Sequence, residues 1–308
     1  MSTPTSDEVR VFSQNVKFGA LSDGRWEEQA GVIRDSGASV VLLQELDTIT
    51  NPAHRQRIRD DLGMELTYSL AVTPEGHKPA KGHTAAAWDP MIWELLKVDV
   101  DYSAKLHHSY CGVHLRRRGH PVMRWSKLAG REVEAAWVFI SVHLTPHSAE
   151  VAMQEAQLLI SRVGRDGGLG GLAGDVNHFP ELVRDIEGAP DELDPDFSQM
   201  RSYNRASRCL TRDKATDPWV ANEVVGKKLR DGDLVDVARH FAIIRRDPSY
   251  LGLTGRHGLV RVDQAHVTRA LVPALTSYVR CDTASDHYGI MFGFDPDEID
   301  KSELFDYT

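Results

Sequence analysis

Apolar residues recur along the chain with two spacings, one typical of helices and one typical of strands. Helical spacing predicts helices over residues 26–34, 55–62 and 149–163. Alternating or continuous apolar runs predict strands over residues 9–16, 39–43, 84–88, 135–144, 169–176, 234–238, 260–267 and 289–294. Predicted elements of the two kinds alternate along the chain.

The sequence indicates one domain. It shows no internal repeat and no Ser/Gly/Pro-rich linker, so we expect a single unit over residues 9–294. A long irregular excursion is expected at about 188–232, where prolines interrupt the pattern and apolar residues are few. Residues 1–8 are polar and predicted to be disordered, and the acidic tail at 295–308 is predicted to be frayed.

The composition is that of an ordinary globular protein. Of 308 residues, 41% are apolar and 26% are charged, which excludes intrinsic disorder for most of the chain. No apolar run approaches the roughly 18 residues of a membrane-spanning helix. The cysteines Cys111, Cys209 and Cys281 fit neither a disulfide framework nor a zinc knuckle. These features, with a polar N-terminus that lacks a secretory signal, favour a cytoplasmic location.

The net charge of −9 conceals two basic segments. Residues 103–131 contain seven lysines and arginines and no acid, and residues 201–230 contain eight against three acids. An acidic protein does not coat nucleic acid nonspecifically, but two basic segments indicate a local anionic partner. The alternative is that both segments are solvated surface loops.

Polar residues follow, precede or interrupt most of the predicted strands. They are Asn15, Glu45, His143, Asp175, Asn177, Asp263, Asp286 and His287. Any one of them alone is more typical of a turn or cap than of a ligand set. If the strands share sheets, these side chains converge at one edge, where four carboxylates repel one another unless a cation holds them. Oxygen ligands without thiolates favour Mg²⁺, with Mn²⁺ as an alternative, over zinc.

Six short motifs around these positions resemble the ordered signature motifs of a known superfamily. They are SQN at 13–15, LLQE at 42–45, SVHLTP at 141–146, LAGDVN at 172–177, RVDQAHV at 261–267 and SDHYGI at 285–290. In this order they resemble the endonuclease/exonuclease/phosphatase superfamily, which includes deoxyribonuclease I, apurinic endonucleases, inositol polyphosphate 5-phosphatases and bacterial sphingomyelinases. The resemblance implies a four-layer α/β sandwich: two mixed β-sheets packed face to face, helices on the outside, and the active site at one end.

The resemblance also implies a divalent-metal site. Glu45 would be the principal ligand, with Asn15 and Asp286 beside it. Some relatives carry an acid two residues after the first asparagine, whereas this chain has Lys17 there, which weakens the case for a second metal ion.

Around the phosphate, the resemblance implies five further roles. Asp175 would orient or deprotonate the attacking water, Asn177 would hold a phosphate oxygen, and His143 would contact the phosphate. Asp263 would pair with His287 and fix its tautomer, so that His287 can stabilise or protonate phosphate oxygens. The implied activity is that of a metal-dependent phosphoesterase.

A nuclease acting on DNA or RNA is the favoured activity, because both basic segments also carry aromatic residues that can stack on bases. The candidate substrate-binding residues are Arg116, Arg117, Arg118 and Trp125. A phosphatase or phosphodiesterase acting on a small or lipid-borne phosphate is the alternative. A catalytically silent binding relative is disfavoured, because the carboxylates and histidines of the motifs are all retained.

Overall fold

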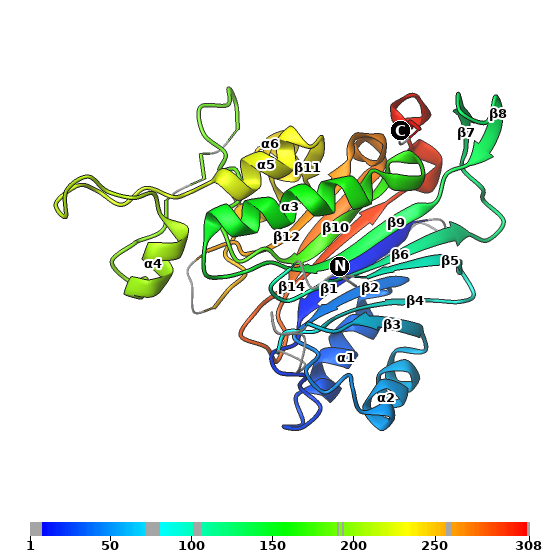
Figure 1. Ribbon diagram of the computed structural model, residues 1–308, viewed down its shortest axis with the longest axis horizontal. Helices are drawn as coiled ribbons and strands as arrows, with labels where there is room; N and C mark the ends of the chain where they lie inside the picture. The colour runs from blue at the N-terminus through cyan, green and yellow to red at the C-terminus, as the bar shows by residue number, and fades with distance from the viewer. Residues whose placement is uncertain are drawn as a thin grey trace.

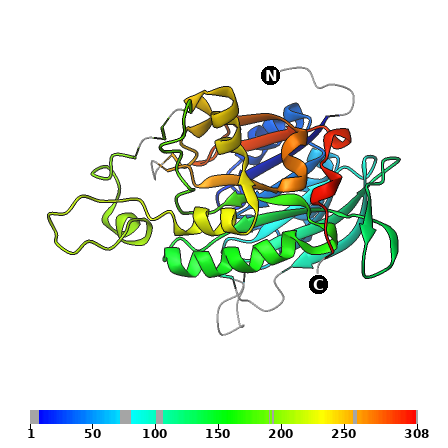
Figure 2. The same ribbon diagram turned by 90° about the horizontal axis from the view of Figure 1, so that it is seen from above.

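In the computed structural model, two β-sheets pack face to face and helices cover their outer faces (Figure 1; Figure 2). The structure describes residues 8–71, 81–100, 106–189, 191–192, 194–256 and 260–306. Apart from Glu8, the segment predicted to be disordered at the N-terminus lies outside the described residues. The four-layer α/β sandwich expected from the sequence is confirmed.

Both sheets are mixed and have six strands. The first contains, in spatial order, β13 (Leu275–Cys281), β14 (Gly289–Phe294), β1 (Val9–Asn15), β2 (Val40–Gln44), β4 (Thr84–Trp88) and β3 (Glu65–Ser69). The second contains β11 (Leu234–Asp236), β12 (Asp263–Thr268), β10 (Leu169–Asp175), β9 (Trp137–His143), β6 (Tyr110–Arg117) and β5 (Trp93–Val100). β1 runs parallel to β2, and β9 runs parallel to β10. The other neighbours run antiparallel, as do β7 (Met123–Ser126) and β8 (Arg131–Glu134) in a separate hairpin.

Helices form the two outer layers (Figure 1). The first sheet is covered by α1 (Trp26–Ser36) and α2 (Pro52–Leu62), and the second by α3 (Ala149–Val163), α5 (Val224–Asp231) and α6 (Val237–Arg245). Short 3₁₀ turns occupy Arg165–Gly167, Pro248–Leu251, Arg269–Ala274, Pro296–Glu298 and Lys301–Glu303. Within the described ranges, no helix combines the length and the apolar character needed to cross a membrane.

Two small elements mark the ends of the sandwich. α4 (Ser202–Arg208) stands beyond one end of the sheets, on the left of Figure 1. The β7–β8 hairpin projects at the opposite end, on the right in both views (Figure 1; Figure 2).

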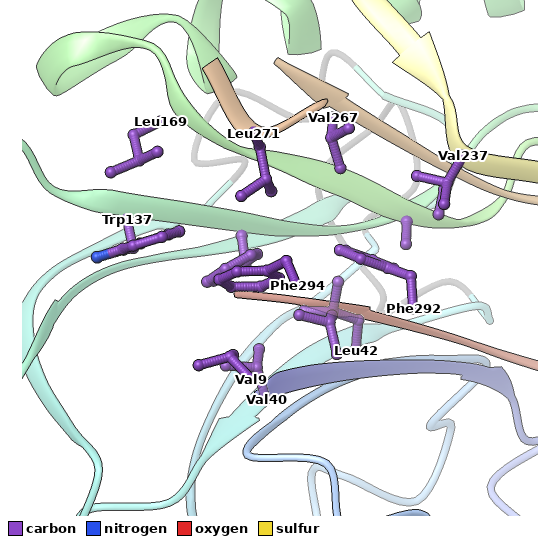
Figure 3. Close-up of a cluster of buried hydrophobic side chains, with 14 of the residues drawn as sticks. Val9, Val40, Leu42, Trp137, Leu169, Val237, Val267, Leu271, Phe292 and Phe294 are labelled. Carbon is purple, nitrogen blue, oxygen red and sulfur yellow. The ribbon is translucent and has the colours of Figure 1, made fainter. Parts of the chain in front are cut away.

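The main hydrophobic core lies between the sheets (Figure 3). Phe294 of β14 stacks on Trp137 of the facing sheet, with ring centroids 5.1 Å apart. Leu42 of β2 enters this core, whereas its neighbour Leu43 packs in a second cluster with α1. Burial on both faces explains why this strand appears in the sequence as a continuous apolar run. Full burial of one such side chain stabilises the fold by about 1.5–3 kcal/mol.

The predicted strands do not include β3, β5, β6, β13 or the β7–β8 hairpin. β5 lies at the edge of its sheet, and its Leu95 and Leu96 are exposed, so the apolar pattern is weak. β6 is an inner strand, but Gly112 and a buried His114 obscure its pattern. Edge position and buried polar residues therefore account for these omissions.

Two predicted strands are shorter than expected. The strand predicted over 234–238 ends at Asp236, whose carboxylate accepts hydrogen bonds from the N–H groups of Ala238 and Arg239 and so begins α6. The strand predicted over 260–267 begins only at Asp263. Asp263 thus stands at the start of β12, not in its interior.

The excursion and the tail are more ordered than predicted. Within residues 188–232, α5 returns to the sandwich and packs on α3, so α4 and the loop after it form the outlying part. The described part of the tail, 295–306, buries Ile299 in the main core and places Asp306 in an ion pair with Arg124. The tail is therefore not frayed up to residue 306.

Candidate active site

The carboxyl ends of four strands meet at one end of the sandwich. β1 and β2 run parallel in one sheet, β9 and β10 run parallel in the other, and the sheets contact each other through these strands. β12 begins at the same end, where Asp263 lies opposite Asp175 in register. The polar residues gathered here are called the rim: Asn15, Glu45, His143, Asp175, Asn177, Asp263 and His287.

The backbone bends sharply where it enters the rim. Glu45 and Asn177 have φ angles of 58° and 63°, in the left-handed region. This conformation costs a non-glycine residue about 1–3 kcal/mol and persists only where surrounding structure enforces it. In β10, Gly174 has a φ of 153°, and an added Cβ there would lie 2.0 Å from the carbonyl oxygen of Val142. The close approach of β9 and β10 at the rim therefore requires glycine.

Asn15 links the two sheets through its side chain. Its Nδ2 donates to Glu45 Oε1 at 2.9 Å and to Asp175 Oδ2 at 3.1 Å. The other Glu45 oxygen accepts the N–H of Phe18 at 3.2 Å. Asn15 is itself held in place by Ser285, whose hydroxyl donates to the Asn15 carbonyl at 2.7 Å. Two carboxylates from facing sheets are thus fixed around one amide.

His287 lies between two carboxylates. Its Nδ1 is 2.8 Å from Asp263 Oδ2, and its Nε2 is 3.8 Å from Asp175 Oδ2. Burial by itself lowers the pKa of His287, but the charges of Asp263 and Asp175 outweigh it and raise that pKa to about 10. His287 is therefore a cation at neutral pH.

His143 stands in a group of histidines on the other side of Asp175. Its Nε2 is 3.6 Å from Asp175 Oδ2, and its ring stacks on His108 with centroids 3.9 Å apart. Burial, with a smaller contribution from the positive charge of His287, lowers the pKa of His143 to about 3. Burial also lowers the pKa of His108, to about 2. These imidazoles are neutral at neutral pH, in contrast to His287.

Asn177 contacts an arginine that the sequence had not singled out. Its Nδ2 donates to the carbonyl oxygen of Leu144 at 3.0 Å, and its Oδ1 accepts from Arg208 Nη2 at 3.2 Å. Arg208 is the last residue of α4 and is only 7% exposed. The basic segment at 201–230 was a signal that included Arg208, but nothing in its spacing distinguished this arginine from its neighbours.

Asp286 lies next to His287 in the chain, but its carboxylate faces a cation. Its Oδ2 is 3.1 Å from Lys17 Nζ. An ion pair with Lys17 therefore occupies one oxygen of this carboxylate. The assignment of Asp286 as a metal ligand stays a prediction.

The predicted substrate-binding residues are not brought to the rim. They are Arg116, Arg117, Arg118 and Trp125. β6 runs antiparallel to β9 and starts beside the rim, where Tyr110 pairs with Val142, so its final arginines lie at the opposite end of the sheet. Trp125 is on the β7–β8 hairpin at that far end (Figure 1). The direction of β6 therefore separates these four residues from the rim.

The rim fits a divalent cation. Ligand atoms of Glu45, His143 and Asp175 lie within 4.8 Å of one another. Those of Asp175, Asp263 and His287 are equally close, but a protonated His287 has no lone pair to offer a metal ion. Burial raises the pKa of Glu45, and the charge of Asp175 raises it further although the hydrogen bond from Asn15 opposes this. A cation among these oxygens would favour the ionised carboxylates and offset their repulsion.

No family model matches the chain, and no curated protein matches its sequence. Solved structures share its fold. An endonuclease/exonuclease/phosphatase family protein from Bacteroides thetaiotaomicron is 13% identical, with 99% of this chain and 100% of that chain covered and a TM-score of 0.56. ANGEL2, a 2′,3′-cyclic phosphatase, is 13% identical, with 94% and 95% covered and a TM-score of 0.57. The endonuclease domain of TRAS1, a telomere-specific non-LTR retrotransposon, is 14% identical, with 93% and 98% covered and a TM-score of 0.52.

These likenesses show the fold. The chain shares the fold of an endonuclease/exonuclease/phosphatase family protein, the fold that its sequence motifs predicted.

Proposed function

We propose that this chain is a divalent-metal-dependent phosphodiester hydrolase that acts on nucleic acid. The observation that carries the proposal is the meeting of three acidic side chains, those of Glu45, Asp175 and Asp263, with the imidazole of His287 at one buried rim. Metal-dependent phosphodiester hydrolysis uses anionic ligands for a cation, a base for water, and a donor for a phosphate oxygen. The rim offers all three kinds of group.

Asn15 and Glu45 would hold the cation, with Asp286 as a further ligand. Their oxygen atoms favour Mg²⁺, with Mn²⁺ as the alternative. When bound, the ion would polarise a phosphate oxygen and neutralise part of its charge.

Asp175 and His287 would move protons. Asp175 Oδ1 accepts the N–H of Asn177 at 2.9 Å and its Oδ2 accepts from Asn15, so the carboxylate is fixed in place to orient or deprotonate a water molecule. The contact of Asp263 with Nδ1 of His287 directs the Nε2–H of His287 into the rim, where it would donate to a phosphate oxygen.

His143 and Asn177 would complete the phosphate site. Because His143 is neutral, it would contact the phosphate as a hydrogen-bond donor and not through charge. Asn177 would support a phosphate oxygen from the second sheet, where one N–H of its amide remains after the bond to Leu144.

Nucleic acid is the substrate class that we favour. The basic segment that contains Arg208 begins at the rim end of the sheets, and solved structures with this fold include the TRAS1 endonuclease domain and a TDP2 complex with a single-strand DNA product. A small phosphate is the second candidate, because the same fold is found in ANGEL2 and in a mannosyl-6-phosphatase. A catalytically silent binding protein is disfavoured, because such a protein does not need charged groups buried at a site that could hold a metal ion.

The substrate class is tested by a panel of plasmid DNA, single-stranded oligonucleotides, RNA, 2′,3′-cyclic nucleotides, sugar phosphates and inositol phosphates. Each is incubated with the full chain in Mg²⁺, in Mn²⁺ and in a chelator. We expect metal-dependent cleavage of polynucleotide and little release from the small phosphates. Turnover of small phosphates alone would contradict the nuclease proposal and favour a phosphatase. Turnover without a metal ion would contradict the proposed metal dependence.

A further inference from the structure

Arg208 joins an outlying part of the chain to the rim. The arm is defined as residues 201–222, and it consists of α4 and the loop that follows (Figure 1). Two strand-like contacts close its base: Cys209 forms a bridge with Ala221, and the N–H of Asn222 donates to the carbonyl oxygen of Arg208 at 2.9 Å. Arg208 is therefore held at the point where the arm leaves the sandwich.

The charge of Arg208 is buried without an acid beside it. Its guanidinium contacts the neutral amide of Asn177, its Nε has no hydrogen-bond partner, and no carboxylate of the described residues lies within 4.0 Å. Arg261 shows the usual pattern: it is also buried, but it pairs with Asp236 at 2.6 Å and Glu192 at 3.2 Å. A buried charge is normally paired, because an unpaired one loses its hydration without compensation.

The pKa of Arg208 also reflects the lack of an acidic partner. Burial lowers the pKa of Arg208, and the charge of Asp175 only partly opposes this. An arginine nevertheless remains protonated at neutral pH. Its planar fork of N–H groups suits the oxygens of a phosphate, to which it can donate two parallel hydrogen bonds.

We propose that Arg208 is an anion-binding residue of the active site and contacts a non-bridging oxygen of the substrate phosphate beside Asn177. This inference rests on the proposed function for the identity of the anion as a phosphate. It makes the arm a part of the active site, because the arm's base carries Arg208 to the rim. The competing explanation is a structural one, in which Arg208 only joins the arm to Asn177.

The variant that separates the two explanations is Arg208→Gln. A glutamine keeps an N–H donor for Asn177 Oδ1 but removes the charge. Arg208→Lys keeps the charge without the planar fork, and Arg201→Gln removes an exposed charge from the same arm as the matched control. Binding of inorganic phosphate to the full chain is measured by calorimetry, together with kcat and KM for bis(p-nitrophenyl) phosphate and the thermal unfolding temperature.

We expect Arg208→Gln to weaken phosphate binding and lower kcat/KM by about 10–100-fold, the loss associated with one charged hydrogen bond. Arg208→Lys should recover part of that loss, and Arg201→Gln should match the wild type. A second measurement needs no variant: the ¹⁵Nε resonance of Arg208 should shift as phosphate is added to the wild-type chain. That shift keeps the proposal testable if Arg208→Gln does not fold.

Wild-type phosphate affinity in folded Arg208→Gln, or an unmoved Arg208 resonance, would overturn the inference and leave the structural explanation. The two proposals fail separately. If the chain cleaves phosphodiesters while Arg208→Gln behaves as wild type, the function stands and the role of Arg208 is wrong. If no substrate is cleaved but phosphate binding depends on Arg208, the anion site stands and the hydrolase proposal is wrong.

Discussion

The two basic segments have similar compositions but very different environments. At the far end of the sandwich, Arg116 pairs with Glu134 at 2.8 Å and Glu94 at 3.4 Å, and Arg118 donates to the carbonyl oxygen of Pro90. At the rim end, Arg208 is buried beside a neutral amide. Charge counted along a sequence does not reveal whether the fold has already neutralised it. The segment that carries a buried cation without an acid beside it, at the rim, is the one that we expect to bind the substrate anion.

At each end one histidine nitrogen lies within 3 Å of an aspartate oxygen, and the two imidazoles differ in the direction of their pKa shift. At the rim, Asp263 and Asp175 raise the pKa of His287 to about 10. At the far end, His114 Nδ1 lies 2.7 Å from Asp166 Oδ2, yet burial lowers the pKa of His114 because a half-exposed Asp166 opposes it only partly. His287 is charged because two buried carboxylates lie near it, whereas His114 has one carboxylate, which is half-exposed.

The largest expected effect is the loss of phosphodiesterase activity when a carboxylate is removed at the rim and not at the far end. Glu45→Gln removes a charge from the rim while it keeps the shape of the side chain, so phosphodiesterase activity should fall by about 100-fold or more and Mg²⁺ affinity should fall with it. Glu134→Gln, which removes a partly buried carboxylate beside Arg116 at the far end, should leave both unchanged. Calorimetric Mg²⁺ titration and initial rates measure the two effects. Unchanged Mg²⁺ affinity in Glu45→Gln would contradict the metal assignment.

A second prediction concerns the two histidine–aspartate pairs. Asp263→Asn should lower the pKa of His287 from about 10, and the activity lost should be greater at pH 8 than at pH 6, because the variant imidazole is then neutral. Asp166→Asn should lower the already depressed pKa of His114 further, with little effect on activity. NMR titration of both imidazoles reports these shifts.

The raised pKa of His287 determines how the stability of the fold depends on pH. The folded-state pKa of His287 is above the unfolded value of about 6.5. Its pairing with Asp263 therefore stabilises the fold fully below about pH 6.5, and this contribution declines as the pH rises through about 10. The difference in unfolding free energy between wild type and Asp263→Asn should shrink across that interval. A difference that grows with pH would refute the pairing.

The sequence predicts features that neighbouring residues determine. α1 ends where Gly37 adopts a left-handed conformation, and α3 begins where Ser148 accepts the N–H of Val151. The rim was predictable because its residues stand at or next to strand ends within short motifs. Arg208 was not, because its contact with Asn177 joins residues 31 positions apart through the packing of the arm. The location of Arg116 could not be predicted either, because it depends on which strand pairs with β6 and in which direction.

The smallest expected effect is on the salt dependence of binding, and it tests whether the arm extends the phosphate site along a polynucleotide. Each phosphate contacted by a lysine or arginine releases condensed counterions, so affinity for nucleic acid falls as salt rises. Arg205, Arg212 and Lys214 supply three cations on the arm. Replacing all three by alanine should make the slope of log K against log salt shallower, by about 0.7 for each phosphate of a single strand that the arm no longer binds.

The matched control removes the same charge from the far end, where Arg118, Lys127 and Arg131 are exposed. Both triple variants have the same net charge, so a difference between them reports location and not overall charge. Binding of a labelled single-stranded oligonucleotide is measured across a salt series, with Ca²⁺ in place of Mg²⁺ to limit turnover. The far-end variant should keep the wild-type slope. If it changes the slope as much as the arm variant does, the contrast between the two ends is wrong. If neither changes it, polynucleotide does not extend along the arm, and the small-phosphate reaction becomes the better proposal.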